Sequence, residues 1–238
     1  MQAVSSISRI ASLMADPKRS AMLWALIDGT PRPTAELAMM AGLTCSSACA
    51  HLSLLSSAGL LRLESRGRTR YFRLATPEVA AAVEALATLV MEAGEARRGG
   101  SPAPLQIPLA MRRARRCGDH LGGELAAELF QRLVDAGWLS RRGEQLLVSG
   151  QGRLELEHLG VYIDALAPHA HRGGVICRCS QWSDQGPHLG GVLGQALFKL
   201  FMQSGWMLDQ EGGRALQTTA LGIQQINGIA RVSTLQVG

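Results

Sequence analysis

The sequence predicts a mainly α-helical protein with small β-hairpins. In this α+β fold an N-terminal winged helix precedes a tandem of winged-helix-like helix–hairpin–helix units. Three observations support the prediction: two short helical patterns joined by a glycine-containing turn, an alternating stretch after them, and a twenty-residue pattern that occurs twice near the C-terminus. A glycine- and proline-rich segment separates the parts. We therefore expect domains over residues 1–98 and 110–238, joined by a linker over 99–109.

The composition is that of a globular protein. Of its 238 residues 47% are hydrophobic and 18% are charged, enough for one large domain or two small ones. The net charge of +5 suits a nucleic-acid binder but is shared by many other proteins. Five cysteines, an odd number, favour reduced thiols over a secreted disulfide framework. With no apolar run long enough for a bilayer and no secretory signal, we expect a cytoplasmic protein without a membrane partner.

The first elements are helical. Apolar residues at helical spacing predict a helix over 4–14, and Asp16-Pro17 predicts the start of another over 18–27. Pro31 and Pro33 are expected to lie in a loop. Thr34 is expected to cap a short helix over 35–41, and Thr44 a second over 45–57, with a turn containing Gly42 between them. Two helices joined in this way are typical of a helix-turn-helix.

A basic hairpin is predicted next. Residues 60–64 and 70–74 alternate between apolar and polar, with a tip at 65–69. Five arginines and one glutamate lie between Arg62 and Arg73, so this segment carries a charge of +4. Thr76-Pro77 then opens a long helix, whose apolar stripe we expect to pack against its copy in a second subunit: Val79, Val83, Leu86 and Val90.

The C-terminal half contains an internal repeat. His120–Leu139 and His188–Met207 are identical at nine of twenty positions without a gap. Each copy is followed by a strand-like segment and a helix start that contains glycine, which predicts a duplicated helix–hairpin–helix unit. The sequence Ala-Gly-Leu-Leu at 58–61 is similar to the segments around the repeated Gly-Trp, at 136–139 and 204–207. Each unit of the C-terminal half is therefore expected to resemble a winged helix.

A helix-turn-helix beside an arginine-rich hairpin suits double-stranded DNA. The second helix enters the major groove, while the hairpin tip reaches the flanking phosphates or the minor groove. Ser46, Ser47, Cys49 and Ala50 lie near the start of that helix, where base edges are usually contacted. The alternative from another class is a winged-helix module that binds proteins and lacks specific DNA binding.

Residues 13–74 resemble the ArsR/SmtB-like winged-helix repressors in LMADPKRSAMLWALIDG, TAELAMMAGL, TCSSACAHLSLLSSAGLL and RGRTRYFRL. The resemblance extends over about the first 95 residues. It implies a homodimer on a palindromic operator that represses its target until an effector binds. Matching the pattern residue by residue gives the expected DNA contacts: Ser46, Ser47, Cys49 and His51 of the recognition helix, and Arg66, Arg68 and Arg70 of the wing.

The chain departs from this family at both of its familiar metal sites. One site needs cysteines where this chain has Ala38-Met39-Met40, and the other needs Asp and His, which are absent from 77–98. Metal sensing is therefore not carried over from the family. The repeat also resembles an extension of some longer members, with its Cys-x-x-Trp and Pro-His-Leu-x-Gly signature, but this does not identify what the extension binds.

Two sensing chemistries would use cysteine and histidine. Cys45 and Cys49 share a face of the recognition helix, where the helix dipole favours a thiolate at Cys45; the alternative is a neutral packing role. Soft ligands in the C-terminal half suit a metal ion, and the repeated histidines can meet across a pseudo-twofold axis. The alternative is that these histidines lie at helix starts, as helix caps or as hydrogen-bonded structural groups. These ligands are Cys117, His120, Cys177, Cys179 and His188.

The third sensing chemistry is a small organic effector in the C-terminal domain. An apolar pocket there can be lined by Trp138, Trp182, Trp206, Phe130 and Phe198. The alternative for the tryptophans repeated at Gly-Trp, Trp138 and Trp206, is a position in the core. No phosphate loop, nucleophile elbow or catalytic carboxylate pair stands out, so we expect no enzymatic activity. No cofactor is expected to be required for DNA binding, and the effector stays unknown.

Overall fold

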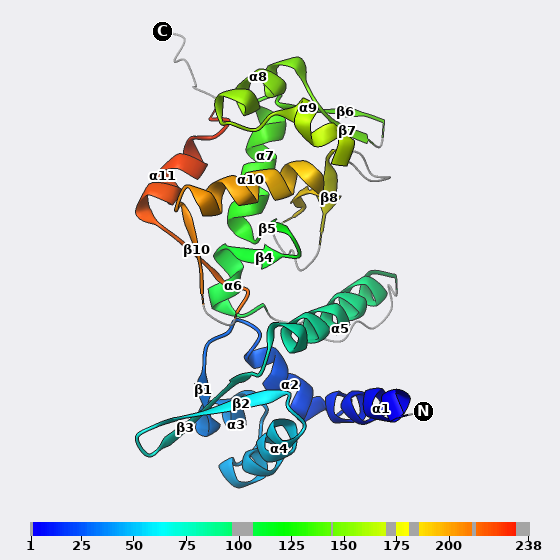
Figure 1. Cartoon of the computed structure of the whole chain (residues 1–238), viewed down its shortest axis with the longest axis vertical. Coiled ribbons are helices and arrows are strands. Elements are labelled where there is room, and N and C mark those ends of the chain that lie inside the picture. The colour runs from blue at the N-terminus through cyan, green and yellow to red at the C-terminus, as the bar shows by residue number, and fades with distance from the viewer. Residues whose placement is uncertain are drawn as a thin grey trace. The chain divides into compact units, whose positions relative to one another are not determined.

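The computed structural model describes residues 2–96, 107–143, 145–169, 175–180, 186–210 and 213–231. The chain divides into two compact units, one of residues 1–108 with 210–214 and one of 109–209 with 215–238. Figure 1 shows the helices and small hairpins from which both units are built, as predicted. Most of the predicted linker (99–106) and Trp182 lie outside the described residues.

The first unit is a winged helix. Its antiparallel sheet has the strand order β1-β3-β2, and the helix-turn-helix α3–α4 precedes the hairpin β2–β3 (Figure 1). The elements are α1 (Gln2–Met14), α2 (Pro17–Ala25), β1 (Arg32–Pro33), α3 (Thr34–Met40), α4 (Cys45–Ser57), β2 (Leu61–Arg66), β3 (Thr69–Leu74) and α5 (Pro77–Ala96).

Local signals explain where these helices begin and end. The Asp16 carboxylate accepts hydrogen bonds from the backbone N–H groups of Lys18 and Arg19, and this caps α2. Oγ1 of Thr44 accepts one from the Ser47 N–H at 3.2 Å and caps α4 in the same way. Gly42, with φ of 62°, supplies the left-handed residue between α3 and α4.

Two local predictions in this unit are wrong. The first residue of α3 is Thr34, and the capping position belongs to Pro33, whose side chain has no polar atom to offer. Residues 32–33 were expected in a loop but form β1, because Arg32 pairs with Phe72 in the sheet and with Asp28 and Glu36 in ion pairs.

The wing hairpin is longer than predicted. The strands pair from Leu61↔Leu74 to Arg66↔Thr69, which leaves only Gly67 and Arg68 in the turn. Gly67 has a φ of 63°, as the first central residue of a type II′ hairpin turn requires. The pairing therefore continues two residues beyond the predicted strand end at Glu64.

The second unit contains two copies of hairpin–helix–hairpin–helix. The first copy comprises β4 (Arg115–Cys117), β5 (His120–Gly122), α7 (Glu124–Asp135), β6 (Leu139–Arg142), β7 (Gln145–Val148) and α8 (Gly150–His158). The second comprises β8 (Cys177–Cys179), β9 (His188–Gly190), α10 (Gly191–Gln203), β10 (Met207–Asp209), β11 (Leu216–Thr218) and α11 (Ala220–Gly228). The short helices α6 (Leu109–Arg113), α9 (Ile163–Leu166) and η1 (Ala167–His169) complete the unit.

The predicted echo of the winged helix is visible at the helix ends. Gly59, Gly137 and Gly205 have φ of 75°, 72° and 66°, and each ends a helix before a strand. The next backbone N–H donates to a carbonyl of the helix in all three, as with Trp138 N to Leu133 O at 2.9 Å. The same helix–glycine–strand junction thus occurs three times.

One feature of the repeat differs from the prediction. His120 and His188 were expected at helix starts, but each lies in the second strand of a small hairpin that precedes the helix. The following glycines explain this, because Gly123 and Gly191 have φ of 97° and 75° and start the helix only after the turn. Each repeat therefore begins with a strand pair that the sequence did not reveal.

Within the described ranges, no single helix is long and apolar enough to cross a membrane. Among the helices in the described part of the chain, one bent pair, α3 with α4, reaches that length and composition, with an angle of 101° between the two helices.

Candidate functional site

The exposed side of α4 is the first candidate site. Ala48, Leu52 and Leu55 are buried and hold the helix on the winged-helix core. The side chains predicted to contact bases lie on the opposite, exposed side at its N-terminal end: Ser46, Ser47 and Cys49, together with Cys45 and Ala50. Small hydroxyl and thiol groups at the first turns of a helix can approach base edges closely.

His51 occupies a different position from these residues. It is half-buried, and its Nδ1 atom lies 3.9 Å from Oδ1 of Asp16 at the start of α2. The hydrogen bond from the Arg19 backbone N–H, with the charges of Arg19 and His51, holds the pKa of Asp16 below its usual value. The structure thus places His51 beside the cap of α2, one turn after the exposed Ser47.

The wing presents arginines of two kinds. Glu64 forms ion pairs with Arg66 at 3.3 Å and with Arg73 at 2.7 Å. The Arg66 guanidinium also stacks over the Tyr71 ring, 5.0 Å from its centroid. Arg68 and Arg70 are exposed and form no ion pair among the described residues, so these predicted contacts are the most available to phosphates.

The two long helices of the winged helix expose apolar side chains. Ile7 on α1 is 69% exposed, and Leu86 and Leu89 on α5 are 48% and 60% exposed. A hollow of about 240 Å³ lies between these helices and α2, lined by Met14, Ser20, Leu23, Trp24, Val83, Leu86 and Ala87. Of the predicted stripe on α5, Val83 packs inside the unit and Leu86 faces outward.

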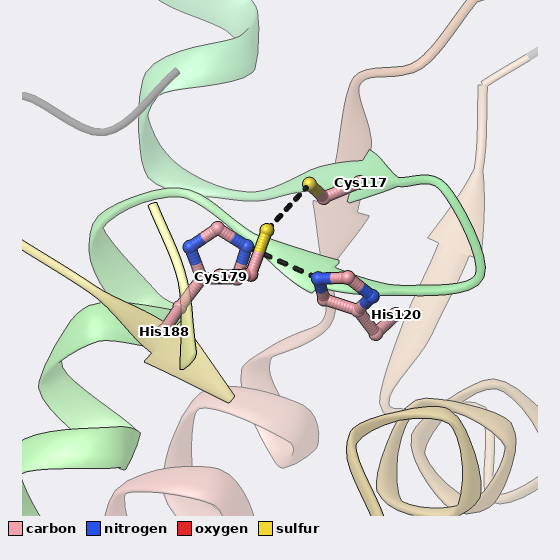
Figure 2. Close-up of side chains that lie close together, drawn as sticks. All are labelled: Cys117, His120, Cys179 and His188. Atoms are coloured by element: carbon pink, nitrogen blue, oxygen red, sulfur yellow. Dashed lines mark hydrogen bonds between the residues drawn. The ribbon is translucent and has the colours of Figure 1, made fainter. Parts of the chain in front are cut away.

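The second candidate site is a cluster of two cysteines and two histidines in the second unit. Figure 2 shows Cys117, His120, Cys179 and His188 pointing toward one another from two hairpins. One ligand atom of each residue lies within 4.8 Å of the others. The two Sγ atoms are 3.8 Å apart, and the two Nε2 atoms are 3.3 Å apart. Cys117, His120 and His188 are buried.

The register of the hairpins produces this cluster. Cys117 is the cross-strand partner of His120 in β4–β5, and Cys179 is the partner of His188 in β8–β9. The histidines are 68 residues apart but the cysteines only 62, because the second hairpin loop is longer. Aligning the two copies without a gap therefore matches the two histidines but not the two cysteines.

Neighbouring groups orient one histidine of the cluster. Nδ1 of His120 lies 2.9 Å from Oδ1 of Asp119. Burial lowers the pKa of His120, but hydrogen bonding to Cys179 and Asp119 outweighs it, and the net pKa lies above the usual value. Nδ1 of His188 is buried without a hydrogen-bond partner among the described residues.

Cys177 lies outside the cluster although it was predicted with the others. It is exposed and pairs with Gly190, two positions before Cys179 on the same strand. Local desolvation, together with the charges of Cys179 and Asp119, raises the pKa of the Cys177 thiol. A raised pKa reduces the fraction of this thiol that is present as thiolate.

The aromatic residues expected around an organic ligand have mostly structural positions. Trp138, Phe130 and Phe198 are buried in the core of the second unit. An open hollow of about 890 Å³ lies beside α10, and its lining mixes cationic, acidic and apolar side chains, among them Arg116, Lys199, Asp209, Leu166 and Met202. The hollow is large enough for a small organic molecule.

Comparison with known proteins gives relatives along most of the chain. The HTH-type transcriptional regulator YdfF of Bacillus subtilis is 31% identical over 217 residues, which are 91% of this chain and 93% of YdfF. The HTH-type transcriptional regulator CmtR of Mycobacterium tuberculosis is 37% identical over 87 residues, which are 37% of this chain and 73% of CmtR. No family model matches the chain.

Solved structures similar to this chain cover the winged helix. The homodimeric winged helix-turn-helix domain of Mb0332 from Mycobacterium bovis, described as a possible ArsR-family regulator, is 23% identical and covers 42% of this chain and 91% of its own, with a TM-score of 0.38. Reduced HlyU from Vibrio cholerae is 24% identical and covers 37% of this chain and 92% of its own, with a TM-score of 0.34.

Proposed function

The chain belongs to the family of HTH-type transcriptional regulators, and from that premise we propose that it represses its target from a palindromic operator as a homodimer until an effector binds the second unit. The resemblance stated for residues 13–74 is confirmed by these relatives. Two features of the same winged helix carry the proposal. The N-terminal end of α4 is exposed, and Arg68 and Arg70 of the wing have no acidic partner among the described residues.

Sequence specificity is assigned to α4. Ser46, Ser47 and Cys49 present polar groups on the two N-terminal turns, where a recognition helix contacts base edges. The wing arginines add phosphate contacts, which fix the register on the duplex without reading the sequence. Specificity and affinity thus come from different elements and respond to different substitutions.

The homodimer is supported by the apolar surface of the first unit. In Figure 1 α1 projects from the rest of the winged helix, and its Ile7 is 69% exposed. Leu86 and Leu89 on α5 are exposed as well. Burying these side chains against a second copy would remove them from water, and a two-fold dimer would present two recognition helices to successive major grooves.

The effector is assigned to the second unit. The hollow beside α10 is lined by two cations, two carboxylates (Asp119 and Asp209) and apolar side chains such as Met202. One of the cations, Arg116, is ion-paired with Asp209 at 2.7 Å, so the mixed lining suits a small organic molecule with both polar and apolar parts. Binding there releases the operator only if the effector prefers the state of the dimer that does not fit DNA.

The test is fluorescence anisotropy with a labelled duplex from the region upstream of the protein's own gene. The expected result is an affinity at least about 10³-fold higher than for a shuffled duplex. Ser46→Ala should reduce that ratio, whereas Ser57→Ala should not, because the Ser57 hydroxyl donates to the Leu54 carbonyl at the far end of α4. Equal affinity for both duplexes would contradict specific repression.

A second candidate mechanism, a thiol switch, is supported by the exposure of Cys45 and Cys49 on the DNA-contacting side of α4. Oxidation of a thiol to a sulfenic acid, or its alkylation, would place a new group in the groove and weaken binding. The same anisotropy titration with a mild oxidant, followed by a reductant, tests this mechanism. Reversible loss in the wild type and no loss in Cys45→Ser/Cys49→Ser would support it; equal loss in both would exclude it.

A further inference from the structure

We propose that Cys117, His120, Cys179 and His188 bind one Zn²⁺ ion in a tetrahedral site that holds the two repeats of the second unit together. Each repeat supplies one cysteine and one histidine, on β4–β5 and β8–β9 respectively. The site lies wholly within the second unit, so it does not rest on the operator or the effector proposed above.

The distances within the cluster fit a single ion. At a zinc–sulfur distance of about 2.3 Å, two tetrahedral thiolates lie about 3.8 Å apart, and at about 2.05 Å two imidazole nitrogens lie about 3.3 Å apart. The Sγ atoms of Cys117 and Cys179 are 3.8 Å apart, and the Nε2 atoms of His120 and His188 are 3.3 Å apart (Figure 2). Two opposite edges of the tetrahedron, out of six, therefore already have the lengths that zinc requires, and the four sulfur–nitrogen edges are within 4.8 Å.

The ligand chemistry selects the kind of ion. Two thiolates and two neutral imidazoles around a divalent ion give a site of zero net charge, which suits a buried position. Two sulfurs and two nitrogens in a tetrahedral arrangement are typical of zinc, whereas magnesium and calcium require oxygen ligands. All four ligand atoms lie within 4.8 Å of one another, so no room remains between them for a cluster of several irons and bridging sulfides.

The surroundings of the cluster support the same assignment. Oδ1 of Asp119 lies 2.9 Å from Nδ1 of His120, and a carboxylate in this position directs Nε2 of a histidine toward a metal. A Cβ at Gly190 would lie 3.4 Å from Cε1 of His120 and 2.8 Å from Sγ of Cys177. A Cβ at Gly122, the equivalent glycine of the first repeat, would lie 2.9 Å from Cβ of Cys117. The glycine that follows each repeated His-Leu therefore leaves space for a ligand side chain of the cluster.

The site is closed, which indicates a structural ion. Four protein ligands complete a tetrahedron and leave no open position for a substrate or a catalytic water. The ligands of the two repeats are 62 and 68 residues apart along the chain, so one ion links distant segments of the unit. Each bound ion displaces two thiol protons, because cysteine ligates as the thiolate.

The test uses the full-length protein purified under reducing conditions with zinc present. Plasma mass spectrometry should give about one zinc per chain, and X-ray absorption of the zinc-loaded protein should show two sulfur and two nitrogen ligands. Exchange for Co²⁺ should produce the strong visible bands of a tetrahedral thiolate site. Removal of the metal should lower the Tm of the wild type, and its return should restore it.

Two variants separate this ligand set from other thiols of the protein. Cys117→Ser should lose the cobalt bands and the metal-dependent rise in Tm. Cys177→Ser is the matched control, because Cys177 lies on the same small hairpin as Cys179 but outside the cluster; it should keep both. Absence of zinc from the wild type, a Cys117–Cys179 disulfide in its place, or a Cys177→Ser variant that behaves like Cys117→Ser would each overturn the proposal. The X-ray absorption spectrum of the zinc-loaded wild type tests the ligand set even if Cys117→Ser does not fold.

Discussion

Gly152 lies so close to the Trp138 carbonyl oxygen that a Cβ on the glycine would stand 2.1 Å from it. Gly222 stands in the same relation to Trp206 in the second repeat, at 2.0 Å. In both repeats the same carbonyl accepts the hydrogen bond of the helix cap residue, Ser149 N at 2.9 Å or Thr219 N at 3.0 Å. The duplication therefore preserves a close contact between the helix after each hairpin and the tryptophan immediately before the first strand of that hairpin.

Gly152→Ala should destabilise the second unit by about 3 kcal/mol, because the methyl group forces the helix away from Trp138. Gly150→Ala is the matched control, since Gly150 starts the same helix and a Cβ there would meet nothing within 4 Å. Urea unfolding followed by circular dichroism measures both. A similar change in the two variants would contradict the close contact.

Arg68→Ala should weaken operator binding at every sequence tested. It should also reduce the magnitude of the negative slope of log K, the association constant, against log[salt] by about 1, because one phosphate contact is lost. Anisotropy titrations over a range of salt concentrations give the slope. Arg142→Ala removes an exposed arginine at the end of a hairpin in the second unit and serves as the control. An unchanged slope for Arg68→Ala would remove the wing from the DNA-binding surface.

Leu89→Glu should shift the protein from dimer to monomer, because the substitution places a charge on the proposed dimer face. Sedimentation velocity at several concentrations measures the oligomeric state. Leu154→Glu is the control, since Leu154 is also 60% exposed but lies on α8 in the second unit. A Leu89→Glu variant that stays as dimeric as Leu154→Glu would exclude α5 from the interface.

The cap of α2 predicts a pH dependence. Since the pKa of Asp16 is lower in the folded protein, its contribution to stability is present above the unfolded pKa of about 3.9 and is lost as the pH falls through the folded value. Asp16→Asn keeps a capping side chain but removes the charge. The wild type should therefore be the more stable at pH 7 and lose this advantage in acid. A stability difference that does not change with pH would contradict the assignment.

Most residues with local signals were predicted well, with Thr34 as the exception, because the capping position before it belongs to Pro33. Thr44 and Asp16 are caps as expected, and Cys45–Ser57 has the predicted bounds, because capping and helical periodicity depend on neighbours in the sequence. The strand at Arg32 was missed, because it depends on Asp28, Glu36 and Phe72, which only the fold brings to it.

In the candidate sites, too, features that depend on sequence neighbours were predicted, and features that depend on distant residues were not. The exposure of Ser46 and Ser47 follows from the helical period, and the exposed Arg68 from the hairpin tip. The Cys117–Cys179 pair was not predicted, because the second hairpin loop is longer and shifts the cysteines from a spacing of 68 to 62. Aligning the hairpins by their Cys-to-His partners, with a gap, would have revealed it.

Binding of a homodimer to a palindromic operator is tested most directly by a hydroxyl-radical footprint of the full-length protein on the DNA upstream of its own gene. A homodimer on a palindromic operator should protect two half-sites related by a two-fold axis, one helical turn or a multiple of it apart, because two copies of α4 occupy successive major grooves. Ser46→Ala should weaken this protection without changing its spacing. Uniform protection of any sequence, or no protection at low salt, would contradict sequence-specific binding of the operator by a homodimer.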